Sequence, residues 1–329
     1  MNLNLRGSAN DIKLQSQGQP IAPSAEIQRL DLFVGTWKTE GETYANADVP
    51  AIKVAFVDTY EWMDGQFFLV HRANGHIGNE EMNTLEFISY DAPSQTYICH
   101  CFDSHGNADL FQADFRDPMW TIEGKSSRFT GMFAIGGNTL TGQWEQASDG
   151  LNWLPWMDIK LTKFTTVVAS KAQSLQPHIA PSAEHQLLNV FVGKWHLEGL
   201  SYGSGQSYEN PHDSGVRWSA EETYEWLPGG FFLVNRFDAK IGNTAISGIE
   251  MVGYDAVSQS YPSQVFDSYG RILSGQRSIR DGIWSSSIGT EYRTTYAFRN
   301  EGKTLASRWE WLDGDDWLVL ADLEGTRVN

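Results

Sequence analysis

The feature that most constrains the fold of this chain is a pentapeptide that occurs twice. Residues 33–37 (Phe-Val-Gly-Thr-Trp) recur as residues 191–195 (Phe-Val-Gly-Lys-Trp), and the segments that follow recur in the same order. Tyr-Asp-Ala at 90–92, for example, returns at 254–256. Solenoid repeats have periods of about 20–50 residues, and this repeat is much longer. The chain therefore contains a duplicated domain.

The duplication sets the domain boundaries within the 329 residues. The first segment is rich in Asn, Gln, Ser and Gly and has no apolar periodicity, which is typical of a mobile arm. A polar segment containing Pro177 separates the two copies, as expected of a linker. The predicted parts are an arm (1–20), a first domain (21–169), a linker (170–178) and a second domain (179–329). The second domain also carries an extra polar insertion at 201–214.

Each copy is predicted to be an antiparallel barrel preceded by a short helix. Both copies open with Ile-Ala-Pro-Ser-Ala-Glu (21–26 and 179–184), in which Ser can cap a helix and Glu suits its positive end. Apolar runs of about 5–8 residues then alternate with turn residues such as Asp64-Gly65. About eight to ten strands per copy follow from this spacing, and closing each meander into a barrel removes its exposed edges. We expect an all-β pair of tandem barrels, packed as an intramolecular pseudo-dimer, with a homodimer as a further option.

Charge and cysteine content exclude several classes of partner. The chain has 24 Lys+Arg against 41 Asp+Glu, a net charge of −17, and both halves are acidic. No nucleic-acid partner and no membrane partner is expected, since phosphate groups would be repelled. Cys99 and Cys101 are predicted on one face of a strand, which is poor geometry for a disulfide. With no apolar leader or membrane span in the sequence, we expect a cytoplasmic protein.

The same motifs resemble those of known families. Gly35 and Trp37, entered from a short helix, resemble the closing motif of calycin-like barrels, the superfamily of lipocalins, fatty-acid-binding proteins and nitrobindin. Residues 89–97 and 102–106, repeated in part at 253–255 and 266–270, are similar to a bacterial calycin-like family of unknown function. The chain also resembles, with no short motif, the cyclase of scytonemin biosynthesis. That resemblance implies ring closure of an indole- and phenol-bearing β-keto acid.

Candidate acid/base residues emerge from comparing the two copies. His71 corresponds to Asn235 in copy 2, and His100 to Gln264. Loss of both histidines in one copy fits a catalytic pair retained in the other, although drift of two structural histidines would look the same. Glu86 and Glu250 occupy matching places inside apolar strands, where burial of an unpaired carboxylate is costly.

Arginine is the natural partner for those carboxylates. Arg72 and Arg236 also occupy matching positions. A Glu–Arg pair that closes the barrel is the structural interpretation. In the functional interpretation Arg72 grips a substrate carboxylate while Glu86 or His71 transfers a proton.

The resulting hypotheses differ in what the cavity does. The first is a cofactor-free enzyme that encloses a small aromatic, carboxylate-bearing substrate and catalyses acid/base-assisted cyclisation. The second is a non-catalytic carrier or sensor of a hydrophobic molecule, and the third a pair of filled barrels. No cofactor and no metal is expected, because the eight histidines and two cysteines lack ligand spacing. The catalytic candidates are Glu86, His71 and Arg72, and the substrate-binding candidates are Trp37, Trp62, His100, Phe102, Trp120, Arg236 and Glu250.

Overall fold

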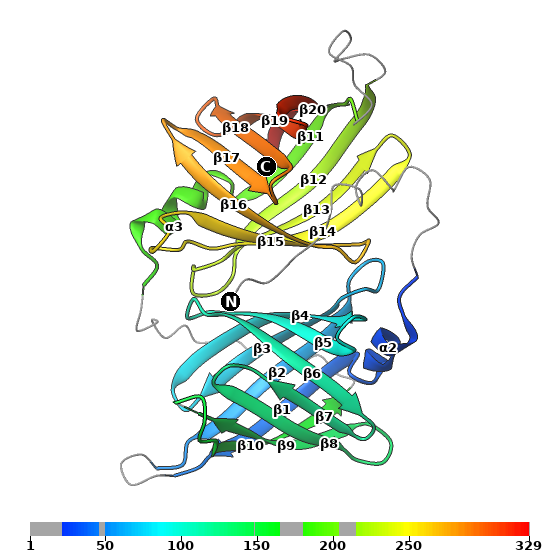
Figure 1. Cartoon of the computed structure of the whole chain (residues 1–329). Helices are drawn as coiled ribbons and strands as arrows, with labels where there is room; N and C mark the ends of the chain where they lie inside the picture. Colours follow the sequence, from blue (N-terminus) through cyan, green and yellow to red (C-terminus); the bar gives the residue numbers. More distant parts are fainter. Residues whose placement is uncertain (1–21, 46–49, 148, 165–179, 204–214, 329) are drawn as a thin grey trace. The chain divides into compact units, whose positions relative to one another are not determined.

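The computed structural model describes residues 22–45, 50–147, 149–164, 180–203 and 215–328. These residues form two compact units that meet in sequence between Ala180 and Pro181 (Figure 1). Each unit is a closed antiparallel barrel of ten strands, so the all-β prediction and the duplication are confirmed. The predicted arm (1–20), the linker (170–178) and most of the insertion (201–214) lie outside the described residues.

Barrel 1 is an up-and-down meander in which each strand pairs with its neighbours in sequence and β1 closes on β10. Closure leaves no strand edge unpaired. Its strands are β1 (Gly35–Thr43), β2 (Lys53–Trp62), β3 (Leu69–Ile77), β4 (Glu80–Asp91), β5 (Thr96–Asp103), β6 (Ala108–Arg116), β7 (Met119–Glu123), β8 (Ser127–Phe133), β9 (Thr139–Gln146) and β10 (Leu154–Phe164).

Barrel 2 repeats this topology, with β11 closing on β20. Its strands are β11 (Gly193–Ser201), β12 (Val216–Trp226), β13 (Leu233–Ile241), β14 (Thr244–Val252), β15 (Tyr261–Asp267), β16 (Ile272–Arg280), β17 (Ile283–Ile288), β18 (Tyr292–Arg299), β19 (Thr304–Asp313) and β20 (Asp316–Val328).

A short helix precedes each barrel, as predicted. In barrel 1 this is α2 (Ala25–Gln28), continued by the 3-10 helix η2 (Arg29–Leu32); barrel 2 has α3 (Ala183–Leu187) and η3 (Leu188–Val190). The hydroxyl of Ser24 accepts a hydrogen bond from the Ile27 amide at 3.3 Å, so it caps α2 as its sequence suggests. None of the helices in the described ranges is long and apolar enough to span a membrane.

The helical segment packs across the end of barrel 1 at which β1 begins. Leu30 and Phe33 are buried there in one cluster with Trp37, Tyr60 and Trp120. The segment is held from β5 as well, since the Tyr97 hydroxyl donates to the Glu26 carbonyl at 2.7 Å. It is also held from β2, where the Trp62 indole donates to Asp31 at 2.7 Å. These contacts close one end of the barrel.

The repeated pentapeptide makes the turn from helix to barrel. Gly35 has φ +125 and Gly193 has φ +122, a region that favours glycine. Two residues after Gly35, the Trp37 side chain points back toward the helical segment, and its indole donates to the Phe33 carbonyl at 2.6 Å. Trp195 makes the same 2.6 Å bond to Phe191. The sequence repeat is thus a repeated local structure.

Candidate functional site

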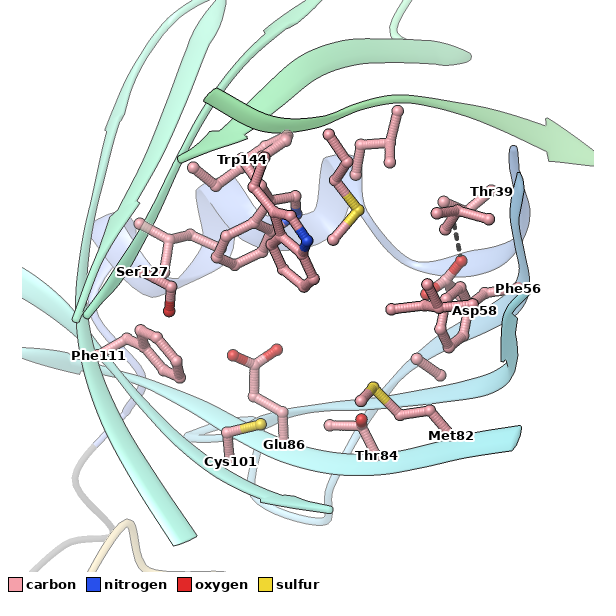
Figure 2. A pocket seen from close by; sticks show the side chains of 18 of the residues that line it. Thr39, Phe56, Asp58, Met82, Thr84, Glu86, Cys101, Phe111, Ser127 and Trp144 are labelled. Carbon is pink, nitrogen blue, oxygen red and sulfur yellow. Dashed lines mark hydrogen bonds between the residues drawn. The ribbon is translucent and has the colours of Figure 1, made fainter. Parts of the chain in front are cut away.

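Barrel 1 contains a cavity of about 870 Å³. Figure 2 shows side chains from several strands converging on it, with the carboxylate of Glu86 directed into its open centre. Much of the wall is apolar, as is typical of small-molecule sites. The aromatic side chains lining it are Phe33, Phe56, Tyr60, Phe111, Trp120, Phe129, Trp144, Trp156 and Tyr44.

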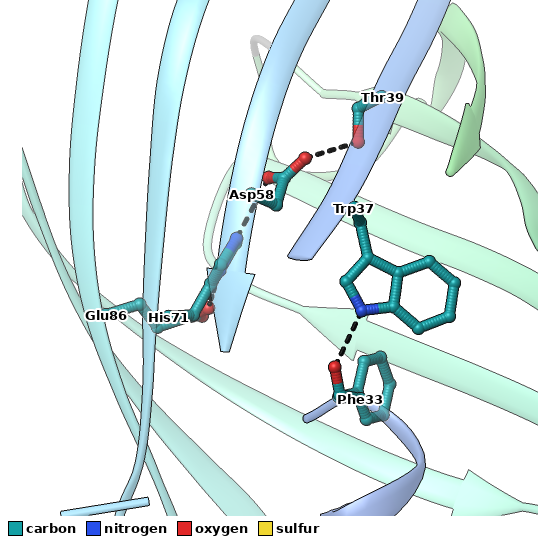
Figure 3. Close-up of polar contacts among 6 residues, drawn as sticks. All are labelled: Phe33, Trp37, Thr39, Asp58, His71 and Glu86. Carbon is teal, nitrogen blue, oxygen red and sulfur yellow. Dashed lines mark hydrogen bonds and ion pairs between the residues drawn. The ribbon is translucent and has the colours of Figure 1, made fainter. Parts of the chain in front are cut away.

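A buried charged group forms the polar part of the wall. His71 Nε2 lies 3.0 Å from Asp58 Oδ1, and His71 Nδ1 lies 2.8 Å from Glu86 Oε2 (Figure 3). The Thr39 hydroxyl donates to the other Asp58 oxygen at 2.5 Å. The His71 ring stacks on Tyr60, with centroids 4.1 Å apart and planes 3° from parallel. Both carboxylates and the imidazole are therefore fixed in place; we call Asp58, His71 and Glu86 the charged triad.

Strand register explains why these residues meet. His71 on β3 pairs directly with Tyr60 on β2 and with Glu86 on β4, and Asp58 lies two residues before Tyr60 on the same face. Burial alone would lower the pKa of His71, but hydrogen bonds and attraction from Asp58 and Glu86 outweigh it and raise the pKa to about 9. His71 is thus an imidazolium at neutral pH, donating one N–H to each carboxylate.

We expect the stability of barrel 1 to fall as the pH rises above neutrality. The folded-state pKa of His71, about 9, exceeds its ordinary value of 6.5, so its stabilising contribution is complete below pH 6.5 and is lost as the pH rises through 9. A difference of this size corresponds to about 3 kcal/mol. The reason is that a neutral imidazole has only one N–H to offer two carboxylates. The measurement is an NMR titration of the His71 ring, with hydrogen exchange of β2 and β3 at each pH; a midpoint near 6.5 would contradict the expectation.

The structure brings together some of the residues predicted from sequence and separates others. Glu86, His71 and Trp120 line the cavity. Arg72 does not, because consecutive strand residues face opposite sides; it lies on the outer face and pairs with Glu61. The expected Arg72–Glu86 pair is therefore not formed, and Arg72 is not placed to grip a ligand in the cavity.

The remaining candidates of barrel 1 lie outside the cavity wall. Trp37 is 1% exposed and packs in the closed end beneath it. Trp62 is bound to Asp31 of the helical segment. His100 and Phe102 project from β5 on the face opposite Cys101, which does line the cavity. Cys99 and Cys101 are free thiols.

The electrostatics of the cavity correct the expected ligand class. Its charged lining consists of Asp58, His71, Glu86, Asp103 and Asp109, and none of the described residues that line it is lysine or arginine. The one cation, His71, is already bound to two carboxylates. A ligand carboxylate would find no free positive partner here, so the carboxylate-bearing substrate expected from sequence does not suit this cavity.

Barrel 2 has a different charged group at the corresponding position. Asn235 replaces His71 and pairs with Tyr224 and Glu250 in the same register. Glu250 is instead bound by Arg277, whose Nη2 donates to Glu250 Oε2 at 2.5 Å. Arg236, like Arg72, lies on the outer face, 3.4 Å from Glu225. The inward arginine of this barrel is thus Arg277.

Two important residues escaped sequence reasoning. Asp58 has a matching carboxylate, Glu222, because Trp37 pairs with Asp58 and Trp195 with Glu222. Both copies therefore have an acidic residue two positions before a conserved tyrosine of the repeat, Tyr60 or Tyr224, and this pattern could have drawn attention to Asp58. Arg277 corresponds to Ala113 in copy 1, and this difference between the copies is visible when their sequences are aligned. Among the described residues, no group of three or more His, Cys, Asp or Glu side chains is arranged to hold a metal ion.

Comparisons with known proteins identify a family and distant structural similarities. The profile described as "Protein of unknown function (DUF1579)" matches residues 22–147 and again residues 180–309. No curated protein matches the chain. Among solved structures, Rv2717c from M. tuberculosis has 10% identity and a TM-score of 0.35, covering 44% of this chain and 99% of its own. A DUF3598 protein of unknown function from Nostoc punctiforme has 11% identity and a TM-score of 0.27, covering 93% of this chain and 100% of its own.

Proposed function

Because the chain belongs to the DUF1579 family of proteins of unknown function, we propose its function from the geometry of barrel 1: it binds a small, largely aromatic or hydrophobic molecule in the interior cavity. The observation that carries this proposal is a cavity of about 870 Å³ bordered by the charged triad. Apolar walls supply burial, and a few fixed polar groups supply orientation.

The size of the cavity and the cost of its charges support a binding role. Its volume falls within the range of about 300–1,000 Å³ typical of small-molecule pockets. The triad side chains are 15%, 7% and 11% exposed for His71, Asp58 and Glu86. Burial of three ionised groups gives little net stability compared with well-packed apolar residues. A polar centre of this kind is therefore better explained by recognition of a ligand than by stability of the barrel.

We expect ligand binding to quench tryptophan fluorescence, mainly through Trp144 and Trp120 in the wall. The measurement is a titration with a panel of indoles, phenols and fatty acids. Trp144→Phe should remove a large part of the signal, whereas Trp309→Phe in barrel 2, where Trp309 packs on Trp218, should leave it intact. Saturable quenching supports the proposal. Failure of every compound in this panel, and of benzamidinium, benzamide and benzoate, to bind by fluorescence and by calorimetry would refute it.

A second candidate is a cofactor-free enzyme that uses Glu86 and His71 for acid/base chemistry, including ring closure of the scytonemin-cyclase type. It is favoured by the hydrogen-bonded carboxylate–imidazole–carboxylate chain, along which a proton can shift between groups. In this proposal Glu86 faces the substrate, and the hydrogen bond from His71, itself bound to Asp58, holds it in position. Because the cavity wall offers no free cation to bind a carboxylate, we expect the substrate to be a neutral or positively charged molecule.

Mass analysis of each titration mixture separates the enzyme from a carrier. A changed mass or retention time identifies turnover, whereas a ligand recovered unchanged supports carriage. If barrel 1 is the enzyme, we expect Glu86→Gln to lower the rate by about 100-fold or more, the usual scale for losing a general acid or base, while binding persists. The matched substitution Glu250→Gln in barrel 2 should leave the rate unchanged; an equal loss from both would contradict the assignment.

A further inference from the structure

Barrel 2 encloses a cation supplied by its own chain. The Arg277 side chain is 2% exposed. Its guanidinium carbon lies 4.9 Å from the ring centroid of Phe191 and 5.6 Å from that of Tyr296. It also binds the Glu250 carboxylate at 2.5 Å. A third ring, that of Tyr224, has its centroid 6.0 Å from the guanidinium carbon. One carboxylate and three aromatic rings around an arginine form a binding arrangement for an organic cation, although Arg277 Nε and Nη1 make no hydrogen bond among the described residues.

Barrel 1 lacks the arginine at the corresponding position. The strand position of Arg277 is that of Ala113, since Arg277 pairs with Tyr261 and Ala113 with Tyr97. Those two tyrosines mark equivalent places, because both donate to a carbonyl of the preceding helix. A second large residue is also absent: Tyr296 pairs with Trp284, whereas Gly131 pairs with Trp120.

Two of the groups that hold the guanidinium in barrel 2 have counterparts in the cavity of barrel 1. Phe33 corresponds to Phe191 in the repeated pentapeptide, and Glu86 corresponds to Glu250 in strand register. Both Phe33 and Glu86 line the cavity. The space filled by Arg277 in barrel 2 is thus bordered in barrel 1 by a matching carboxylate and a matching aromatic ring, while Gly131 replaces Tyr296.

The net charge inside each barrel also indicates that the cavity of barrel 1 lacks a cation that barrel 2 has. In barrel 2, burial raises the pKa of Glu222 to about 7, with repulsion from Glu250 adding to the effect. Arg277 therefore largely balances the carboxylates there. In barrel 1, protonated His71 balances the charge of one of the two triad carboxylates. Asp103 and Asp109 also line the cavity, and none of the described lining residues is a lysine or arginine that could balance them. The cavity of barrel 1 carries a net negative charge.

We propose that the cavity of barrel 1 is selective for a small organic cation, an amidinium or ammonium group on an aromatic body, which binds near Glu86 and Phe33 in the place that Arg277 fills in barrel 2. This inference rests on the proposed binding function and specifies its ligand class. The cation contacts the Glu86 carboxylate and an aromatic face, and the aromatic body packs against Trp120 and Trp144.

The test compares three ligands of one shape on the full chain by calorimetry: benzamidinium, benzamide and benzoate. We expect benzamidinium to bind about ten-fold or more tightly than benzamide, because a charge-assisted bond is added, and benzoate to bind more weakly still. Benzamide or benzoate binding as tightly as benzamidinium would overturn the inference while leaving small-molecule binding intact. Failure of all three ligands, together with the wider panel, would refute the binding function itself.

Two variants locate the site. Ala113→Arg supplies barrel 1 with its own guanidinium and should abolish benzamidinium binding. Arg277→Ala removes the internal cation from barrel 2 and should create a second benzamidinium site there, measured as an increase in stoichiometry. Circular dichroism and the remaining fluorescence signal establish that each variant is folded. If Ala113→Arg folds and still binds benzamidinium with unchanged affinity, the assigned position is wrong.

Discussion

Replacement of His71 by asparagine is expected to destabilise barrel 1 by about 3 kcal/mol or more at neutral pH, the usual cost of removing one partner from a buried charged group. Asn235 is the natural counterpart in barrel 2, so the substitution fits the fold sterically. It leaves Asp58 and Glu86 buried without a cation, and one of them must take up a proton. The loss should therefore shrink as the pH is lowered toward the ordinary pKa of a carboxyl group.

Hydrogen exchange of β2, β3 and β4 measures this loss for barrel 1 alone. Two controls accompany it. Arg72→Ala, on the outer face beside exposed Glu61, should cost less than about 1 kcal/mol. Ala113→Arg added to His71→Asn should restore part of the stability, because it reproduces the cation of barrel 2. If His71→Asn costs no more stability than Arg72→Ala, the triad is not a buried ion cluster.

Replacement of Trp37 by alanine is expected to cost about 4 kcal/mol, within the usual range for a fully buried tryptophan. The indole fills the closed end of the barrel, donates to Phe33 at 2.6 Å and lies beneath the Lys163 ammonium, 5.2 Å from its ring. Its loss leaves a void that the helical segment cannot fill and leaves the Phe33 carbonyl without that donor. Both the segment and the cavity floor should become mobile.

The matched substitution in barrel 2 is Trp195→Ala. Trp195 makes the same bond to Phe191 and has Arg327 above its ring at 4.5 Å. Hydrogen exchange should show each variant loosening its own barrel by a similar amount. Trp37→Phe keeps most of the volume but loses the indole N–H, so it should cost less than the alanine variant. Equal losses for phenylalanine and alanine would mean that the hydrogen bond, rather than packing, determines stability here.

Much of the fold follows from local features of the sequence. The repeated pentapeptide fixes both barrel starts, since Gly35 needs a positive φ and Trp37 needs an acceptor one turn earlier. The turn dipeptides separate runs that have no helical periodicity, and closure follows because a long meander would otherwise expose two edges. Ten strands per barrel is the upper limit of the expected range.

The site was less accessible from sequence because side-chain direction depends on register. His71 and Arg72 are adjacent, yet one faces the cavity and the other the outer surface, and a displacement of one residue exchanges them. Glu86 was identifiable from its apolar strand. Asp58 could be noticed only as an acid matched by Glu222, because its role depends on contact with His71, thirteen positions away in sequence and on the next strand. The role of Arg277 as an internal cation could be recognised only once Arg277 and Ala113 were both known to face the barrel interior.

The sealed end of barrel 1 has a practical consequence for ligand design. Asp58 pairs with Trp37 near that end, whereas β1 finishes at the other rim, where Tyr44 and Leu154 are exposed. Because the helical segment closes the opposite end, we expect a benzamidine bound at Glu86 to direct its para position toward this rim. Para-linked derivatives should therefore still bind when attached to a resin, and ortho-substituted ones should not, so a para-linked matrix is the form in which to retain this protein on a column.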